Sequence, residues 1–133
     1  MLVFFDSSAF VKRYINESGT DQVLDWCDKA TEIGLASIIL PEIISAFCRL
    51  RRESKISEAQ YRQLKSLLLT DIEDASLCDL APTISALENN TLRAMDAIHI
   101  ASAIIMKADI FISADKRQCE AAVQTGLRVE SLF

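Results

Sequence analysis

The amino-acid sequence predicts an α/β fold with a mostly parallel central sheet, and two observations lead to this prediction. Short apolar runs alternate along the chain with longer segments whose apolar residues recur at helical spacing. Strands that alternate with helices in this way pack as layers around a parallel sheet. The 133 residues, of which 50% are hydrophobic, suffice for one compact core. We therefore expect residues 1–133 to form a single domain.

Five apolar runs are expected to form strands. The first, Leu2–Phe5, is uninterrupted and ends directly before Asp6. This pattern is typical of a buried parallel strand that is followed by a helix with a polar start. The other four predicted strands are Leu35–Leu40, Ala75–Leu80, Ile110–Ile112 and Leu127–Val129.

Capping residues mark several of the helices between these strands. Pro41 suits the first turn of a helix, because its missing N–H costs nothing there. Ser57 and Gln60 have the spacing of a capping box, and Gly126 is placed to end the last helix. Helices are expected at about 11–15, 21–30, 41–50, 57–71, 82–88, 92–107 and 116–125.

Composition limits the possible functions and locations. The net charge of −5 speaks against a protein that holds nucleic acid through its overall field, but it does not exclude a nuclease. No apolar run is long enough to cross a membrane, and Asp6 comes too early for a signal peptide. We therefore expect a cytoplasmic protein without membrane association. Reduced core thiols, rather than a zinc site, are expected for the widely spaced Cys27, Cys48, Cys78 and Cys119.

Carboxylates that lie far apart in the chain are expected to meet at one edge of the sheet. Asp6 and Asp115 follow predicted strands, and Glu42 lies in the first turn of a helix that begins at the same edge. Ligand sites of parallel sheets lie outside the carboxyl ends of the strands. Asp96 has no clear preceding strand, although it lies near the start of its helix, in line with His99.

Each carboxylate alone also has a structural explanation, since aspartate after a strand is a common helix cap and glutamate in a first turn complements the helix dipole. As a set, however, these like charges would repel one another unless a cation lay between them. An all-oxygen site selects Mg²⁺ or Mn²⁺ over zinc. The sequence therefore predicts a site for a hard divalent metal.

The order and spacing of these motifs resemble the PIN domain family, and more narrowly the VapC-type toxins of bacterial and archaeal toxin–antitoxin modules. The resemblance spans the whole chain. It rests on Asp6-Ser7-Ser8-Ala9, Pro41-Glu42-Ile43, Asp96-Ala97-Ile98-His99-Ile100-Ala101, Phe111-Ile112-Ser113-Ala114-Asp115 and Gly126-Leu127-Arg128-Val129.

The resemblance implies a three-layer α/β/α fold and a metal-dependent ribonuclease. By matched position, Asp6, Glu42, Asp96 and Asp115 form the catalytic and metal-binding quartet, with Ser8 and Ser113 as polar supports. It also implies an RNA substrate, a homodimer and an antitoxin protein as partner. RNA contacts are expected from basic residues, namely Lys12, Arg13, Arg49 and Arg52.

Other assignments remain open at this point. His99 is expected to be a buried, hydrogen-bonded histidine rather than a general base. An aspartyl-phosphate phosphatase would need a second aspartate two residues after Asp6, where the chain has Ser8. A catalytically inactive module with the same fold that binds RNA or protein is the other alternative.

Overall fold

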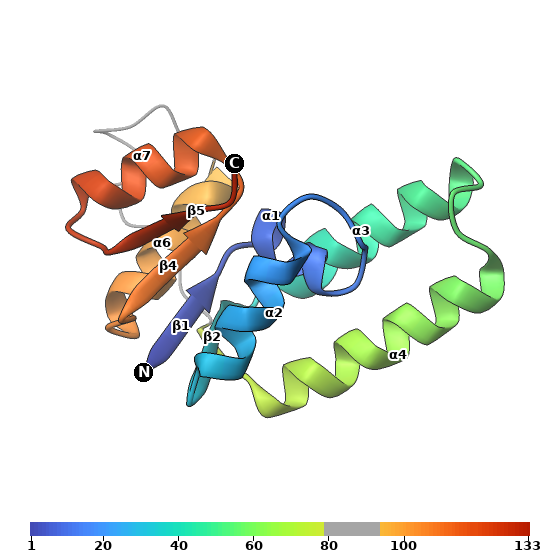
Figure 1. The fold of residues 1–133 in the computed structure, drawn as a ribbon, viewed down its shortest axis with the longest axis horizontal. Coiled ribbons are helices and arrows are strands. Elements are labelled where there is room, and N and C mark those ends of the chain that lie inside the picture. Colours follow the sequence, from blue (N-terminus) through green and yellow to red (C-terminus); the bar gives the residue numbers. More distant parts are fainter. Residues whose placement is uncertain (79–93) are drawn as a thin grey trace.

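The computed structural model describes residues 1–78 and 94–133, which form a three-layer structure around a five-stranded parallel sheet (Figure 1). The strands are β1 (Leu2–Phe5), β2 (Glu32–Ala36), β3 (Ser76–Cys78), β4 (Ile110–Ser113) and β5 (Val129–Ser131). They lie in the order β3-β2-β1-β4-β5, and every neighbouring pair is parallel. The predicted α/β class and parallel sheet are confirmed.

The described helices cover both faces of the sheet. They are α1 (Ser7–Phe10), the 3-10 turn η1 (Val11–Arg13), α2 (Thr20–Lys29), α3 (Ile39–Arg52), α4 (Glu58–Asp74), α6 (Ala94–Ile105) and α7 (Lys116–Gln124). Side chains alternate along β1, so Val3 and Phe5 pack with the helices from α1 to α4, and Phe4 packs with α6 and α7. These two apolar clusters on opposite faces explain the three layers.

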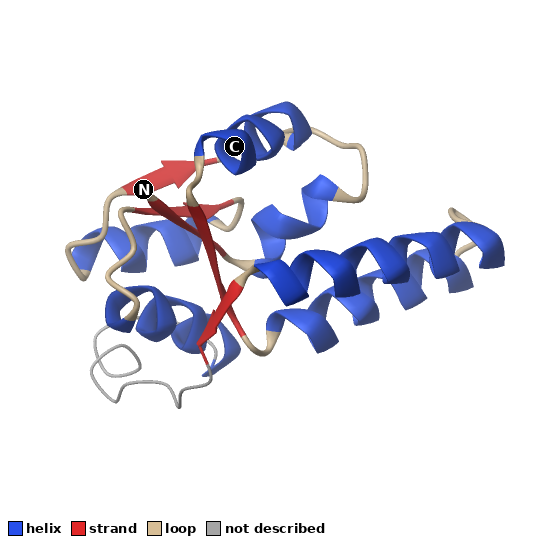
Figure 2. Cartoon of the chain, turned by 90° about the horizontal axis from the view of Figure 1, so that it is seen from below, coloured by secondary structure: helices blue, strands red, loops and turns tan. Residues whose placement is uncertain are grey.

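Helices α3 and α4 form a long hairpin that projects beyond the sheet (Figures 1 and 2). The predicted capping box at its second helix is present, because Gln60 N donates to Ser57 Oγ at 3.1 Å and Ser57 N donates to Gln60 Oε1 at 2.7 Å. Gly126 adopts a φ of +89° directly after α7, a left-handed conformation that favours glycine. Both predicted helix signals thus fix real boundaries.

Two predicted strands are displaced along the chain. The second strand is Glu32–Ala36 rather than Leu35–Leu40, because Ile39 is fully buried as the start of α3 and not as part of the sheet. The last strand is Val129–Ser131 rather than Leu127–Val129. It is an edge strand whose polar residues Glu130 and Ser131 pair with Ile112 and Ser113. In both segments, the hydrophobic run alone predicted the wrong strand boundaries.

Other predicted boundaries agree to within a few residues or cannot be compared. The predicted helix at 11–15 is instead the short α1 and η1 over 7–13. The predicted helix at 82–88 lies outside the described residues, as do the last two residues of the predicted third strand and the first two of the helix at 92–107. No helix in the described part of the chain is long and apolar enough to cross a membrane.

The strand order places a topological switch beside β1. From β1 the chain moves to β2 and β3 on one side, and β4 and β5 lie on the other. Phe5 at the end of β1 pairs with Ile112 near the end of β4, and Asp6 N donates to Ile112 O at 3.2 Å. The carboxyl ends of β1 and β4 therefore meet at the position where ligands of open parallel sheets bind.

Candidate active site

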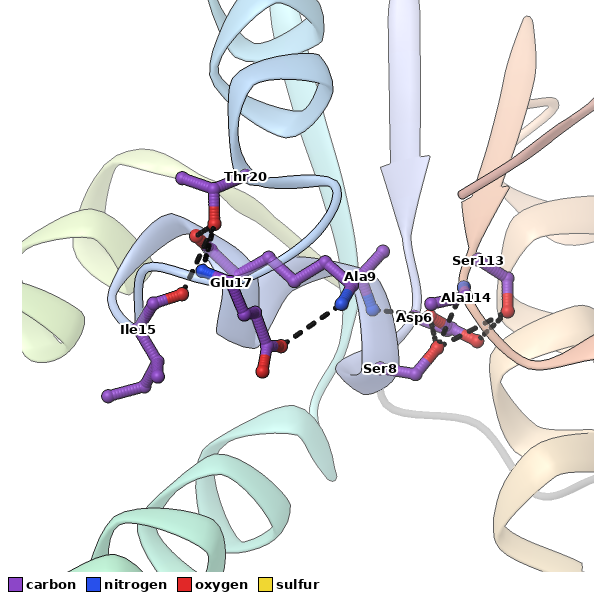
Figure 3. Close-up of polar contacts among 9 residues, drawn as sticks. Asp6, Ser8, Ala9, Ile15, Glu17, Thr20, Ser113 and Ala114 are labelled. Carbon is purple, nitrogen blue, oxygen red and sulfur yellow. Dashed lines mark hydrogen bonds and ion pairs between the residues drawn. The ribbon is translucent and has the colours of Figure 1, made fainter. Parts of the chain in front are cut away.

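Asp6 lies at this junction as a buried carboxylate that is surrounded by neutral donors (Figure 3). Its Oδ1 accepts hydrogen bonds from Ser8 Oγ at 2.8 Å and from Ala9 N at 3.0 Å. Its Oδ2 accepts from Ser113 Oγ at 2.5 Å and from Gln118 Nε2 at 2.7 Å. Two donors for each oxygen match the ordinary capacity of a carboxylate.

Burial dominates the electrostatics of Asp6. Loss of hydration raises the pKa of its carboxyl above the usual value, although His99 and the donors Ser113, Ser8 and Ala9 all act in the opposite direction. The charged form is therefore costly in the absence of a cation, in spite of its hydrogen bonds.

The hydroxyls of Ser8 and Ser113 connect the ends of β1 and β4. Besides its bond to Asp6, Ser8 Oγ accepts from Ala114 N at 3.0 Å, and Ser113 Oγ accepts from Asp115 N at 2.9 Å. The loop after β4 is thus held by the same hydroxyls that fix Asp6. Asp115 caps α7, since its Oδ1 accepts from Gln118 N at 3.1 Å. Both aspartates that follow strands therefore serve as helix caps as well as candidate site residues.

Glu42 is oriented by two donors from different layers. Its Oε1 accepts from Ser7 Oγ of α1 at 2.7 Å and lies 2.7 Å from His99 Nε2 of α6. Burial acts to raise the pKa of Glu42, but the hydrogen bonds from His99 and Ser7 outweigh it and hold the pKa below its ordinary value. No hydrogen bond to Oε2 occurs within the described residues.

His99 is buried and hydrogen-bonded, as expected, but its partner is a site carboxylate rather than a core group. Only 1% of its surface is exposed. An ionised Glu42 carboxylate can only accept, so Nε2 of His99 is the donor in this contact. Nδ1 has no partner among the described residues. The geometry makes His99 a residue that positions Glu42.

Asp96 links the quartet electrostatically. It lies on α6, one turn before His99, and is half-buried. Its pKa is raised by burial, then by the charge of Asp115, and further by those of Asp6 and Glu42, whereas His99 lowers it. The charges of the other three carboxylates therefore act on Asp96, although those residues lie after β1, on α3 and after β4.

The carboxylates are coupled through their charges but are not drawn together to coordination distance. Within the described part of the chain, no three His, Cys, Asp or Glu side chains are arranged to hold a metal ion as they stand. Mg²⁺ usually retains several waters and needs only one or two direct carboxylate ligands. An all-oxygen set of mutually repelling carboxylates, with Asp6 already saturated by donors, fits such a hydrated ion.

The basic residues that were expected to contact RNA occupy two different environments. Lys12 pairs with Glu17 at 3.0 Å, and Arg13 pairs with Asp71 at 3.0 Å. Arg13 lines a cavity of about 270 Å³ that also includes Glu32 at the amino end of β2, so it lies away from the carboxyl edge. Lys12 and Arg13 thus hold structural ion pairs.

Arg49 and Arg52 are exposed near the end of α3. They follow Glu42 by seven and ten residues, which corresponds to about 10 and 15 Å along a helix. The predicted basic cluster therefore starts near the site and extends away from it along the projecting hairpin.

Two site residues were not anticipated from the sequence. Ser7 was considered only as part of a motif, yet its hydroxyl contacts Glu42. Gln118 contacts Asp6 through its side chain and Asp115 through its backbone. A glutamine in the first turn of an amphipathic helix ordinarily indicates an exposed position, so only its spacing of three from the capping Asp115 could have suggested this role.

Solved structures with the same fold cover almost the whole chain. FitAcB from Neisseria gonorrhoeae shares 15% identity over 96% of this chain and 95% of its own, with a TM-score of 0.66. VapBC2 from Rickettsia felis, bound to a DNA fragment from their promoter, shares 14% over 100% of both chains, with a TM-score of 0.63. The sarcin-ricin loop cleaving toxin VapC20 from Mycobacterium tuberculosis shares 13% over 90% and 94%, with a TM-score of 0.61.

Sequence comparison gives the family directly. No curated protein matches the chain. The model of the PIN domain, however, matches residues 3–124, which include every site residue described above. The fold shared with the solved structures agrees with this match. The chain therefore belongs to the PIN domain family.

Proposed function

We propose that this protein is a metal-dependent endoribonuclease that hydrolyses RNA phosphodiester bonds with Mg²⁺ or Mn²⁺. The observation that carries the proposal is the family match over residues 3–124, in a chain where the charges of Asp115, Asp6 and Glu42 act on Asp96 at the carboxyl edge of the sheet. Such mutual repulsion is relieved when a divalent cation binds. Membership of the PIN domain family supports nuclease chemistry at this edge.

Each residue of the site has a separate role in this proposal. Asp96 and Asp115 bind the ion directly or through its waters, and Asp6 contributes its charge, because four donors already hold its oxygens. Glu42 orients the attacking water or accepts its proton through Oε2, since Ser7 and His99 already occupy Oε1. Ser8 and Ser113 keep Asp6 in place. A bound divalent ion would supply activation of water and neutralisation of charge on the phosphoryl oxygens.

The biological role we propose is that of a cytoplasmic toxin that is controlled by an antitoxin protein. Solved structures with this fold include VapBC2 bound to promoter DNA and VapBC-1 from nontypeable Haemophilus influenzae, while VapC20 is described as cleaving the sarcin-ricin loop. These names support a toxin–antitoxin setting and an RNA substrate for the present chain. The homodimer is proposed from the family resemblance alone. Arg49 and Arg52, which are exposed on α3, are the better candidates for RNA contacts.

The two alternatives receive less support from the geometry. An aspartyl-phosphate phosphatase needs an accessible nucleophilic oxygen, whereas Asp6 is buried and both of its oxygens are held by donors. An inactive module that only binds would gain nothing from an uncompensated charge at Asp96, because such a charge is unfavourable without a ligand.

The test is cleavage of structured RNA by purified wild type, Asp96→Asn and the control Asp21→Asn, with Mg²⁺ or Mn²⁺ and with EDTA. Asp21 is an exposed carboxylate in the first turn of α2 that does not contribute to the raised pKa of Asp96. Wild type and Asp21→Asn should cleave only with metal, and Asp96→Asn should lose about 100-fold or more in rate. Equal activity in all three proteins, or activity that persists in EDTA, contradicts the proposal.

A further inference from the structure

Gln118 is a buried polar residue that no assignment above includes in the metal site. It lies in the first turn of α7, and only 2% of its surface is exposed. Glutamine is rarely buried in this way unless both ends of its amide have partners. Its burial therefore requires an explanation from the groups around it.

Gln118 touches two of the four carboxylates at once. Its Nε2 donates to Asp6 Oδ2 at 2.7 Å, and its backbone N donates to Asp115 Oδ1 at 3.1 Å. No other residue in the described part of the chain donates directly to both of these carboxylates through its own side chain and backbone. Gln118 thus contacts two of the four carboxylates of the proposed metal site.

The other end of the amide has no partner within the described part of the chain. Gln118 Oε1 is buried and accepts no hydrogen bond from any described residue. A buried acceptor without a donor is energetically unfavourable. The amide cannot avoid this cost by turning over, because Asp6 then would face an oxygen in place of an N–H. The orientation of the amide is therefore fixed by Asp6, and the amide oxygen is left without a donor from the described residues.

The position of this oxygen follows from covalent geometry. The nitrogen and oxygen of a primary amide lie about 2.3 Å apart, so Oε1 is at most about 5 Å from Asp6 Oδ2. Its missing partner must be a hydrogen-bond donor or a cation, and the carboxylates of Asp6, Asp96 and Asp115 favour a positively charged species here. Amide oxygens are suitable ligands for hard divalent ions and good acceptors for their waters.

We propose that Gln118 belongs to the metal site, and that its Oε1 accepts a hydrogen bond from a water bound to the divalent ion while Nε2 continues to hold Asp6. This inference rests on the proposed function, since it needs the same ion. It adds a neutral oxygen to the acidic quartet. Groups of this kind around metal sites typically change metal affinity by about 10–100-fold.

The experiment is calorimetric titration of the full-length protein with Mn²⁺, using Gln118→Met and Gln118→Glu. Gln118→Met removes both ends of the amide at similar volume, whereas Gln118→Glu keeps an oxygen and loses the N–H. Gln118→Met should weaken Mn²⁺ binding at least about tenfold. Gln118→Glu should bind Mn²⁺ at least as tightly as wild type.

Gln124→Met is the matched control, because it makes the same substitution at an exposed glutamine at the end of the same helix. Its Mn²⁺ affinity should remain within about threefold of wild type, clearly above that of Gln118→Met. Thermal melting in EDTA verifies that each variant is folded. If Gln118→Met binds as tightly as wild type, Oε1 holds only an ordinary buried water and the inference is wrong. Equal weakening in Gln118→Glu and Gln118→Met would assign the effect to the N–H instead, which also overturns it.

The two proposals fail in different ways. If wild type binds no Mn²⁺, the metal site and the proposed function fail together with this inference. If wild type binds Mn²⁺ and Asp96→Asn weakens it, but Gln118→Met does not, only the role of Gln118 is wrong.

Discussion

The substitution Ser113→Ala tests the buried junction between β1 and β4 most directly. The hydroxyl is fully buried, donates to Asp6 at 2.5 Å and accepts from Asp115 N at 2.9 Å. A hydrogen bond to a charged group contributes about 1.5–3 kcal/mol, and the loss of an acceptor for the Asp115 N–H adds about 1 kcal/mol at a partly exposed position. We expect Ser113→Ala to lower the free energy of unfolding by about 2–4 kcal/mol.

The assay is urea denaturation in EDTA, with the midpoint and the slope compared between variants. Ser66→Ala, on the exposed surface of α4, is the control and should change the free energy of unfolding by less than about 0.5 kcal/mol. Because the Ser113 hydroxyl also lowers the pKa of Asp6, its removal should weaken Mn²⁺ binding. A stability for Ser113→Ala within about 0.5 kcal/mol of wild type refutes the reasoning, since the donor to a buried carboxylate would then have no energetic role.

Three further predictions concern the carboxylates. His99→Leu removes the donor to Glu42 at similar volume and should lower the free energy of unfolding in urea by about 1.5–3 kcal/mol. His99→Gln keeps an N–H and should lower it less. Equal losses in the two variants would show that the hydrogen bond to Glu42 does not stabilise the fold. In EDTA, the raised pKa of Asp96 keeps its carboxyl protonated in the native state at pH values just above 3.8, where the unfolded chain has already released this proton. The free energy of unfolding should therefore fall as pH rises through the raised pKa. Asp96→Asn lacks this contribution, and parallel stability–pH curves for variant and wild type would contradict it. Mg²⁺ should raise the melting midpoint of wild type and should do so much less for Asp6→Asn, with an equal rise in both excluding Asp6 from the site.

Much of the site follows from the chain because strand order and direction fix where strands end. Asp6 directly follows β1, Asp115 lies two residues after β4, and Glu42 lies in the first turn of the helix after β2. A shift in the boundaries of β2 did not disturb this placement, since α3 still starts at the same edge. Topology is therefore a more robust guide to a site than the exact limits of each strand.

The remainder depends on packing between layers, which local patterns do not encode. Asp96 and His99 reach the site from α6, which covers the opposite face of the sheet from α3. Only the family motif indicated their position. The contact between His99 and Glu42 joins these two layers across the end of the sheet. Gln118 was missed for a similar reason, since its burial depends on how α7 packs against β4 rather than on its own sequence neighbours.

The neutral surroundings of the site carboxylates explain why this edge of the sheet is suited to a cation. Asp6 is held by hydroxyl, amide and backbone donors, and none of the described basic side chains forms an ion pair with Asp6, Asp96 or Asp115. Neutral donors fix the geometry of a carboxylate without cancelling its charge, whereas an ion pair such as that between Arg13 and Asp71 cancels most of it. The negative potential at the carboxyl edge therefore persists in the folded protein. A divalent ion with its waters can neutralise this potential and, through a single water, also provide the donor that Gln118 Oε1 lacks.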